Sequence, residues 1–154
     1  MDSTLLQNVY LFRGMDKTEL NSVVEICTVA THNPGDTIFM KGEQAKALYL
    51  IKHGSVKIQQ TTKGGDTLVV ATLGTGSHFG EMSFVDGEAR SATAVAGERT
   101  EVIAIPYDRL KNFLTENKEA AVKFYRELSH FLCGRLRMTT TDLNFAREKN
   151  LSHF

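Results

Sequence analysis

The chain has 154 residues, 42% of them hydrophobic, so it can bury one sizeable core and is too short for two full domains. Its 18 basic and 18 acidic residues cancel, which excludes a strong overall field toward nucleic acid or an anionic membrane. No apolar run reaches the length of a signal peptide or a membrane-spanning helix, so a single soluble domain over residues 1–154 is expected.

Residues 1–28 are expected to be helical. Asp16 and Glu19 have the spacing of a capping pair, in which the Asp16 side chain accepts from a first-turn amide and Glu19 reaches back. A helix over roughly 16–27 follows. Its apolar face consists of Leu20, Val23, Val24 and Cys27.

Residues 29–106 have the pattern of short strands separated by turns, because glycine recurs between β-branched or alternating runs. The alternating run 55–59, the turn at 63–66 and the run 67–72 predict a hairpin. The other strands are expected at 37–40, 48–51, 92–96 and 100–105. The whole predicts a mainly β chain, an antiparallel β-roll or jelly roll with flanking helices.

Residues 107–150 are expected to form the C-terminal helices, because glycines almost vanish after Pro106. Helical spacing of apolar residues predicts helices over 108–115 and 118–133. Beyond them, residues recur at spacings of four, three, four and three: Leu132, Leu136, Thr139, Leu143 and Ala146. This seam of about two heptads indicates a homodimer that pairs through the C-terminal helix.

The stretch FGEMSFVDGEARSATAVA places a carboxylate, Glu81, and a guanidinium, Arg90, nine residues apart among small and apolar residues. A short helical turn beginning at Gly80-Glu81-Met82 would present unpaired amides to an anion. Arg90 adds a fork that matches two phosphate oxygens, and Ser91 adds a hydroxyl donor. Glu81 would repel a phosphate unless it accepts protons from a sugar hydroxyl. A ribose cyclic phosphate offers both groups.

The same spacing has a plainer interpretation: an ordinary turn at Gly80, a solvated helix start at Glu81, and an Arg90 stem that covers the sheet. However, the pattern F-G-E followed by R-S-A-T resembles the phosphate-binding cassette of cyclic nucleotide-binding domains. The upstream strings PGDTIFMKGE and LYLIKHGSVKI are similar to the glycine-marked strands of that family in order and spacing. Ser83 replaces an alanine that is usual in the family, a small change that should leave the site intact.

The resemblance implies a β-roll that holds cAMP or cGMP in this cassette. By matching positions, Glu81 would accept the ribose 2′-hydroxyl, and the Gly80 amide would assist. Arg90 and Ser91 would hold the cyclic phosphate together with the Ala92 amide. The ligand-binding residues predicted in this segment are Gly80, Glu81, Met82, Arg90, Ser91 and Ala92.

The run Met138-Thr-Thr-Thr-Asp142 is unusual inside a predicted helix, because β-branched residues and aspartate are mediocre helix formers. One interpretation is a break near Gly134, with Thr141 or Asp142 capping a further helix. Another follows from the segment RLRMTT, which resembles the part of the long helix of catabolite activator proteins that touches adenine. That resemblance implies base contacts by Thr139 and Thr140, one of them across the dimer. Such contacts favour cAMP, although Ser91 is also compatible with guanine.

Other functions find less support. A metal-dependent enzyme on a jelly roll needs clustered histidines and a carboxylate, whereas the five histidines are scattered. Cys27 and Cys133 lack the spacing of a zinc site or a disulfide framework, and this usage fits a reducing cytoplasm. A transcription factor would continue into a helix-turn-helix, but the chain stops at Phe154, so direct nucleic-acid binding is not expected.

The sequence therefore predicts a cytoplasmic cyclic-nucleotide sensor, with cAMP as the favoured ligand and with no catalytic residue, cofactor or metal. The alternatives are a cGMP-binding domain and a degenerate dimerisation module that binds no nucleotide. Ligand is expected to draw the helices of residues 118–150 over the base. That movement would control an output region. The chain would be either a stand-alone sensor or part of a longer protein that carries the output domain.

Overall fold

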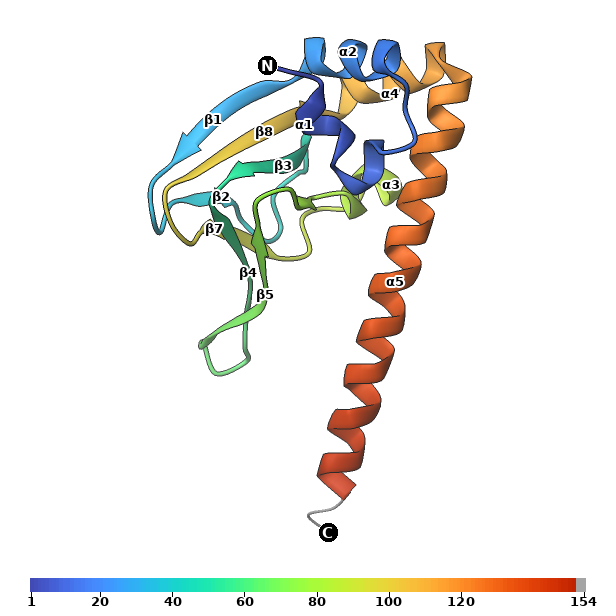
Figure 1. Cartoon of the computed structure of the whole chain (residues 1–154). Coiled ribbons are helices and arrows are strands. Elements are labelled where there is room, and N and C mark those ends of the chain that lie inside the picture. Colours follow the sequence, from blue (N-terminus) through green and yellow to red (C-terminus); the bar gives the residue numbers. More distant parts are fainter. Residues whose placement is uncertain (152–154) are drawn as a thin grey trace.

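The computed structural model describes residues 1–151, in which helices from the N-terminal and C-terminal parts of the chain lie together on one side of a β-roll (Figure 1). The helical elements are α1 (Thr4–Gln7), the 3-10 turn η1 (Tyr10–Phe12), α2 (Lys17–Ile26), α3 (Met82–Asp86), α4 (Tyr107–Glu116) and α5 (Lys118–Leu151). The strands are β1 (Thr28–His32), β2 (Thr37–Phe39), β3 (Ala47–His53), β4 (Ser55–Thr61), β5 (Thr67–Gly74), β6 (His78–Phe79), β7 (Thr93–Ala96) and β8 (Thr100–Pro106). The predicted mainly β fold with flanking helices is confirmed.

The strands form two antiparallel four-stranded sheets, in the orders β1-β8-β3-β6 and β2-β7-β4-β5. The predicted hairpin is present, since β4 and β5 pair with Ser55 opposite Gly74 and Thr61 opposite Thr67. Strands β1 and β6 were not predicted. β1 has no alternation for a sequence pattern to reveal, because four of its five residues are exposed, and β6 has only two residues.

Two hydrophobic clusters form the interior. The larger joins the N-terminal elements, strands β3 and β8, and helices α4 and α5 through residues that include Leu11, Phe12, Leu48, Ile105, Leu110 and Phe124. The smaller fills the roll between the two sheets and includes Phe39, Ile51, Val56, Phe79, Ala94 and Val102. The roll therefore has a core of its own, and the flanking helices close a second core against one of its sheets.

The capping pair at the start of α2 forms as predicted. The Glu19 amide donates to Asp16 Oδ1 at 2.8 Å, and the Asp16 amide donates to Glu19 Oε1 at 2.9 Å.

The Cys27 thiol lies within 3.1 Å of the Val23 carbonyl, to which it donates. Burial raises the pKa of Cys27 to about 12, so its sulfur stays a neutral thiol near pH 7.

Helix α5 runs without interruption from Lys118 to Leu151, so the predicted alternative of a break near Gly134 is wrong. The three threonines lie within the helix, and each hydroxyl donates to the carbonyl four residues earlier. Thr139, Thr140 and Thr141 make these bonds at 3.0, 2.9 and 3.0 Å. Their hydroxyls are thus satisfied by the helix backbone itself, and none of them caps a new helix.

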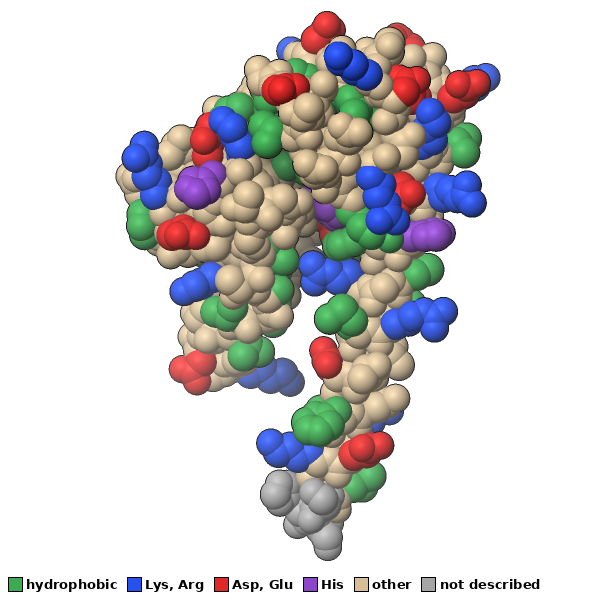
Figure 2. All heavy atoms as spheres, viewed as in Figure 1, with side chains coloured by type: hydrophobic (Ala, Val, Ile, Leu, Met, Phe, Trp, Pro, Cys, Tyr) green, Lys and Arg blue, Asp and Glu red, His purple; other side chains and the backbone are tan. Residues whose placement is uncertain are grey.

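The two ends of α5 have different surroundings. In its first half, Ala120, Phe124 and Leu128 are buried, and the ion pairs Arg13–Glu127 and Lys123–Glu19 link it to the N-terminal segment. From residue 133 to residue 151 every residue is exposed. Figure 2 shows this second half standing clear of the roll, with hydrophobic side chains along it. Within residues 1–151, no helix combines the length and the apolar character needed to cross a membrane.

Candidate functional site

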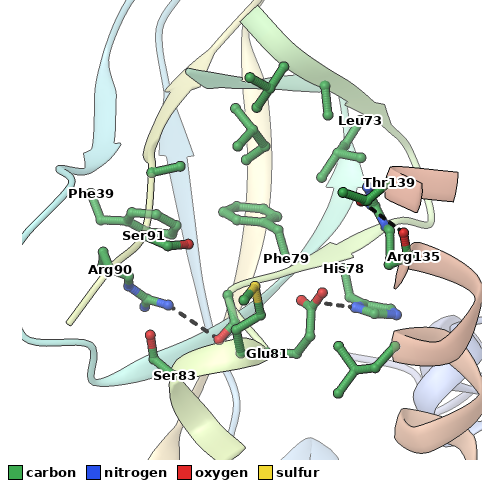
Figure 3. Close-up of a pocket in the computed structure, with 17 residues that line it drawn as sticks. Phe39, Leu73, His78, Phe79, Glu81, Ser83, Arg90, Ser91, Arg135 and Thr139 are labelled. Carbon is green, nitrogen blue, oxygen red and sulfur yellow. Dashed lines mark hydrogen bonds and ion pairs between the residues drawn. The ribbon is translucent and has the colours of Figure 1, made fainter. Parts of the chain in front are cut away.

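A cavity of about 340 Å³ lies between the roll and α5 (Figure 3). One wall is apolar and comes from the β4–β5 hairpin, with Ile58, Val70, Ala71 and Leu73. The floor comes from the segment that runs from β6 through α3 to β7, and it carries the polar side chains Glu81, Ser83, Arg90 and Ser91. Its volume is within the range of roughly 300–1,000 Å³ usual for small-molecule sites.

Arg90 lies on this floor and is only 5% exposed. Its Nη1 donates to the Gly80 carbonyl at 3.2 Å and to the Tyr107 hydroxyl at 3.0 Å, and its Nη2 donates to the Ala47 carbonyl at 2.6 Å. The Phe39 ring lies 4.0 Å from the centre of the guanidinium, in cation–π geometry. The side chain is therefore held in one orientation by a ring and three acceptors.

These partners of Arg90 are all neutral. Among residues 1–151, none of the ion pairs between side chains involves Arg90. The three hydrogen bonds use three of the five N–H donors of a guanidinium. A buried charge is normally paired, because desolvation of an isolated ion is unfavourable. The Arg90 guanidinium therefore keeps an uncompensated positive charge and two unused N–H donors, with which an anion in the cavity can pair.

The backbone conformation and the closeness of Arg90 require glycine at position 80. Its φ of 82° lies in the left-handed region, and a Cβ at this position would come within 2.6 Å of Arg90 Nη1. Its carbonyl accepts from both Arg90 and the Tyr107 hydroxyl. Burial raises the pKa of Tyr107, against the opposing effect of the nearby Arg90 charge. The phenol therefore stays protonated and acts as a neutral bridge between Gly80 and Arg90.

Glu81 lies at the start of α3, on the same floor, and is 8% exposed. Its carboxylate approaches His78, with Oε2 3.4 Å from Nδ1 (Figure 3). Although Glu81 is the N-cap residue of α3, its side chain makes no capping hydrogen bond. The carboxylate thus keeps acceptor capacity on the cavity side, which a hydroxyl donor of a ligand can use.

Helix α5 closes the other side of the cavity with Leu132, Arg135 and Thr139. Thr139 and Arg135 point toward the hairpin residue Leu73 in Figure 3. Thr140 is not among the residues that line the cavity, and its exposed side chain bonds to the Leu136 carbonyl. Within one chain, the structure therefore places Thr139 at the cavity and Thr140 outside it.

The predicted site residues otherwise converge. The cavity is lined by Gly80, Glu81, Met82, Arg90, Ser91, Ala92 and Thr139. Met82 is 54% exposed at the rim, whereas Ala92 is 9% exposed. The Ser91 carbonyl accepts from Gln60 Nε2 at 2.7 Å, which fixes the backbone of the cassette to β4. The interpretation of Arg90 as a stem that merely covers the sheet does not agree with its buried, hydrogen-bonded guanidinium.

Sequence reasoning missed the residues that hold these groups in place. Ala47 acts through its carbonyl, for which no side-chain pattern exists. Tyr107 and Phe39 contact Arg90 from distant parts of the chain. Only His78 left a usable signal, since a histidine three residues before a glutamate at the start of a short helix is well spaced for a contact.

Comparison with known proteins agrees with this architecture. Residues 30–117 match the cyclic nucleotide-binding domain family. The cyclic AMP receptor protein of Thermus thermophilus is 39% identical over 95 residues, which are 62% of this chain and 44% of that protein. The human cGMP-dependent protein kinase 2 is 28% identical over 130 residues, which are 84% of this chain and 16% of the kinase. This chain therefore spans less than half the length of either relative.

Solved structures show the same fold. The crystal structure of the Thermus thermophilus catabolite activator protein has a TM-score of 0.78 at 32% identity and covers 88% of this chain, which in turn covers 62% of that one. The N-terminal domain of a transcriptional regulator from Streptomyces coelicolor has a TM-score of 0.76 at 27% identity, with coverages of 90% and 94%. The family match spans more than half of the chain, and the chain therefore belongs to the cyclic nucleotide-binding domain family.

Proposed function

We propose that this chain is a regulatory domain that binds a cyclic nucleotide, in the first place cAMP, in the cavity between the roll and α5. The observation that carries the proposal is Arg90, a buried cation without an anionic side-chain partner among residues 1–151. A cyclic phosphate supplies the missing charge and accepts the guanidinium donors that the protein does not use. The Ser91 hydroxyl lies on the same floor and adds a further donor.

Glu81 supports a nucleotide rather than a simple phosphate. A carboxylate accepts hydrogen bonds and repels an anion, so its presence beside Arg90 needs a hydroxyl donor on the same ligand. The ribose 2′-hydroxyl is such a donor, and it is covalently fixed near the cyclic phosphate. Membership of the cyclic nucleotide-binding domain family agrees with this ligand class.

The base would lie between the hairpin wall and α5. Apolar Val70 and Leu73 suit the faces of a purine, and Thr139 offers hydroxyl lone pairs to an exocyclic amine such as that of adenine. This favours cAMP. The alternative is cGMP, for which Ser91 would also bond the base, and the relatives include proteins named for each nucleotide.

Regulation would act through α5. Three α5 residues line the cavity, yet from residue 133 onward the helix is exposed and not packed on the roll. A ligand that contacts both sides would stabilise one position of the helix over others. We propose that an output region, in a longer protein or in a partner, responds to that change, and that the chain itself carries no catalytic activity.

A homodimer through α5 is the second element of the proposal. Leu136 is 67% exposed and Leu143 is 49% exposed, and both lie on the heptad seam. A second copy would cover this face. Leu136→Asp combined with Leu143→Asp is expected to give monomers in sedimentation equilibrium, whereas Met138→Asp, equally exposed but off the seam, should leave the dimer intact. A wild-type monomer at every accessible concentration would remove this element.

Thermal unfolding with and without nucleotide tests the ligand. At a hundredfold excess of ligand over its Kd, binding stabilises a protein by about 2.7 kcal/mol, which raises Tm by several degrees for a chain of this size. We expect this rise with cAMP, a smaller one with cGMP, and little with 5′-AMP, which lacks the cyclic diester. Arg90→Ala should show little or no rise, because a hundredfold weaker Kd leaves only about 0.4 kcal/mol of stabilisation at the same ligand concentration. Unchanged unfolding of the wild type with both cyclic nucleotides would contradict the proposed function.

A further inference from the structure

His78 is a buried histidine directly beside the candidate site, and its side chain is 3% exposed. One side of its ring faces Glu81, with Nδ1 3.4 Å from the carboxylate oxygen Oε2. The ring also packs on Phe131 of α5, with centroids 4.2 Å apart. Its Nε2 is buried and has no hydrogen-bond partner among residues 1–151. His78 thus touches both the floor of the cavity and the helix that closes it.

We propose that His78 is a positioning residue for ribose recognition. Its Nδ1–H holds the Glu81 carboxylate in the orientation that accepts the 2′-hydroxyl, and its contact with Phe131 ties that carboxylate to α5. This inference deepens the proposed function and depends on it. It assigns a role to a residue outside the predicted ligand-binding set.

The first argument is the number of bonds that orient Glu81. A glutamate side chain has several rotatable bonds, so without a partner its carboxylate samples many positions. Within the described part of the chain, the carboxylate of Glu81 has one hydrogen-bonding partner, His78, and makes no capping bond to α3. The bond occupies Oε2 and leaves Oε1 to accept from a sugar hydroxyl.

The second argument is the unpaired nitrogen. Buried polar atoms are nearly always hydrogen-bonded, so Nε2 is an exception that requires a reason. A phenylalanine at position 78 would pack on Phe131 without leaving a polar atom unpaired. Within the part of the chain that the structure describes, the one polar interaction that an imidazole adds here is the Nδ1 contact with Glu81. A neutral imidazole donates from only one nitrogen, and an ionised carboxylate can only accept, so the pair selects the Nδ1–H tautomer.

Among residues 1–151, the charged groups around His78 offer its ring no acidic partner other than Glu81. A second cavity, of about 280 Å³, adjoins the ring and is lined by Tyr10, Arg13, Ser77 and Arg135. Arg13 is paired with Glu127 at 2.8 Å, and Arg135 lies over the Phe131 ring at 5.2 Å. Glu81 is therefore the acidic group that faces the imidazole from the elements packed around it.

Two substitutions separate the donor from the ring. His78→Phe keeps an aromatic ring on Phe131 and removes the donor to Glu81. His78→Asn removes the ring and keeps an amide N–H close to the position of Nδ1. His53→Phe, at an exposed histidine of β3, is the matched control. For each protein, the Kd values of cAMP and 2′-deoxy-cAMP are measured by calorimetry, and their ratio reports recognition of the 2′-hydroxyl.

A hydrogen bond to a charged group corresponds to a Kd ratio of roughly 10 to 100 in favour of cAMP. We expect such a ratio for the wild type, for His53→Phe and, somewhat reduced, for His78→Asn. For His78→Phe it should fall to about three or less, a change that a purely structural role would not produce. A wild-type ratio retained in His78→Phe would overturn the inference and leave the proposed function standing.

Other outcomes are also decisive. A wild type that binds no cyclic nucleotide would remove the proposed function and this inference with it. A wild type that binds cAMP and 2′-deoxy-cAMP equally would remove the roles of Glu81 and His78 but not that of Arg90. If His78→Phe does not fold, the tautomer of His78 in the wild type, measured by nitrogen-15 NMR, decides. The Nδ1–H form is expected, and the Nε2–H form would overturn the inference.

Discussion

The two halves of α5 differ in what holds them. Up to Leu132 the helix contributes to the larger core, with Phe124 fully buried and Leu128 2% exposed. From residue 133 onward it is exposed throughout. The cavity lies at the junction, so packed elements form its floor, and its far side includes Arg135 and Thr139 from the exposed half of the helix.

This difference suggests that the floor of the cavity and the exposed half of α5 have separate roles in ligand binding. We expect the floor to keep its geometry when the second half of α5 moves, because Arg90 is fixed by Ala47, Gly80 and Tyr107. We therefore expect the floor to supply most of the affinity for a ligand. The α5 side is expected to select the base and to respond to binding. The following predictions test this division.

The largest effect is expected at Arg90. Charge-assisted hydrogen bonds contribute about 1.5–3 kcal/mol each, so Arg90→Ala should weaken cAMP binding about a hundredfold or more. Arg90→Lys keeps the charge but loses the planar fork of donors. Its affinity for cAMP should therefore lie between those of the wild type and Arg90→Ala. Calorimetry measures the affinities, and thermal unfolding checks that each variant still folds cooperatively. An affinity within about threefold of the wild type in Arg90→Ala would contradict the role of the floor.

The free energy of unfolding tests whether the two halves of α5 differ in packing. Leu128→Ala removes a buried side chain and should lower the free energy of unfolding by about 2–5 kcal/mol. Leu136→Ala, two turns further along, removes a side chain that is 67% exposed and should change it by less than about 0.5 kcal/mol. Urea unfolding of the monomer measures both. Equal losses would show that the second half of α5 is packed.

A smaller effect is expected at Glu81. Glu81→Ala should weaken cAMP binding roughly 10- to 100-fold, because one hydrogen bond to a charged acceptor is lost. In that variant 2′-deoxy-cAMP should bind about as well as cAMP, since the acceptor for the hydroxyl is gone. Glu88→Ala is the control, because Glu88 is an exposed glutamate of the same segment. Persistent discrimination against 2′-deoxy-cAMP in Glu81→Ala would place the ribose elsewhere.

The smallest effect is expected on α5. Thr139→Ala removes one neutral hydrogen bond and should lower the preference for cAMP over cGMP about two- to tenfold. Thr141→Ala, on the same helix but outside the cavity, should leave that preference unchanged. Thr140→Ala should act only if the neighbouring copy supplies this residue to the site. Competition binding with both nucleotides measures these preferences, and no change in Thr139→Ala would remove α5 from base selection.

The residues that carry charge in the site could be found from the sequence because they lie within one short segment. Gly80, Glu81, Arg90 and Ser91 are close in the chain, and their chemistry is readable from residue type. The capping pair of α2 was predictable for the same reason, since both partners are local. A local pattern of side chains was sufficient for the capping pair, whereas the site residues were preferred over the plainer interpretation through the resemblance to cyclic nucleotide-binding domains.

The supporting contacts could not be found in this way. Ala47 holds Arg90 with a backbone carbonyl 43 residues away, and such a contact depends on the pairing of whole strands. The continuity of α5 was one of two interpretations that the sequence left open, because the weak helix propensity of the threonine run fits either a break or a continuous helix. Strand β1 was missed because it is exposed along most of its length.

The most direct test of the central claim is a crystal structure of the chain with cAMP. The account predicts the cyclic phosphate within hydrogen-bonding distance of the Arg90 guanidinium, and the ribose 2′-hydroxyl on Glu81. A nucleotide bound outside this cavity, or one inside it whose phosphate points away from Arg90, would contradict the account.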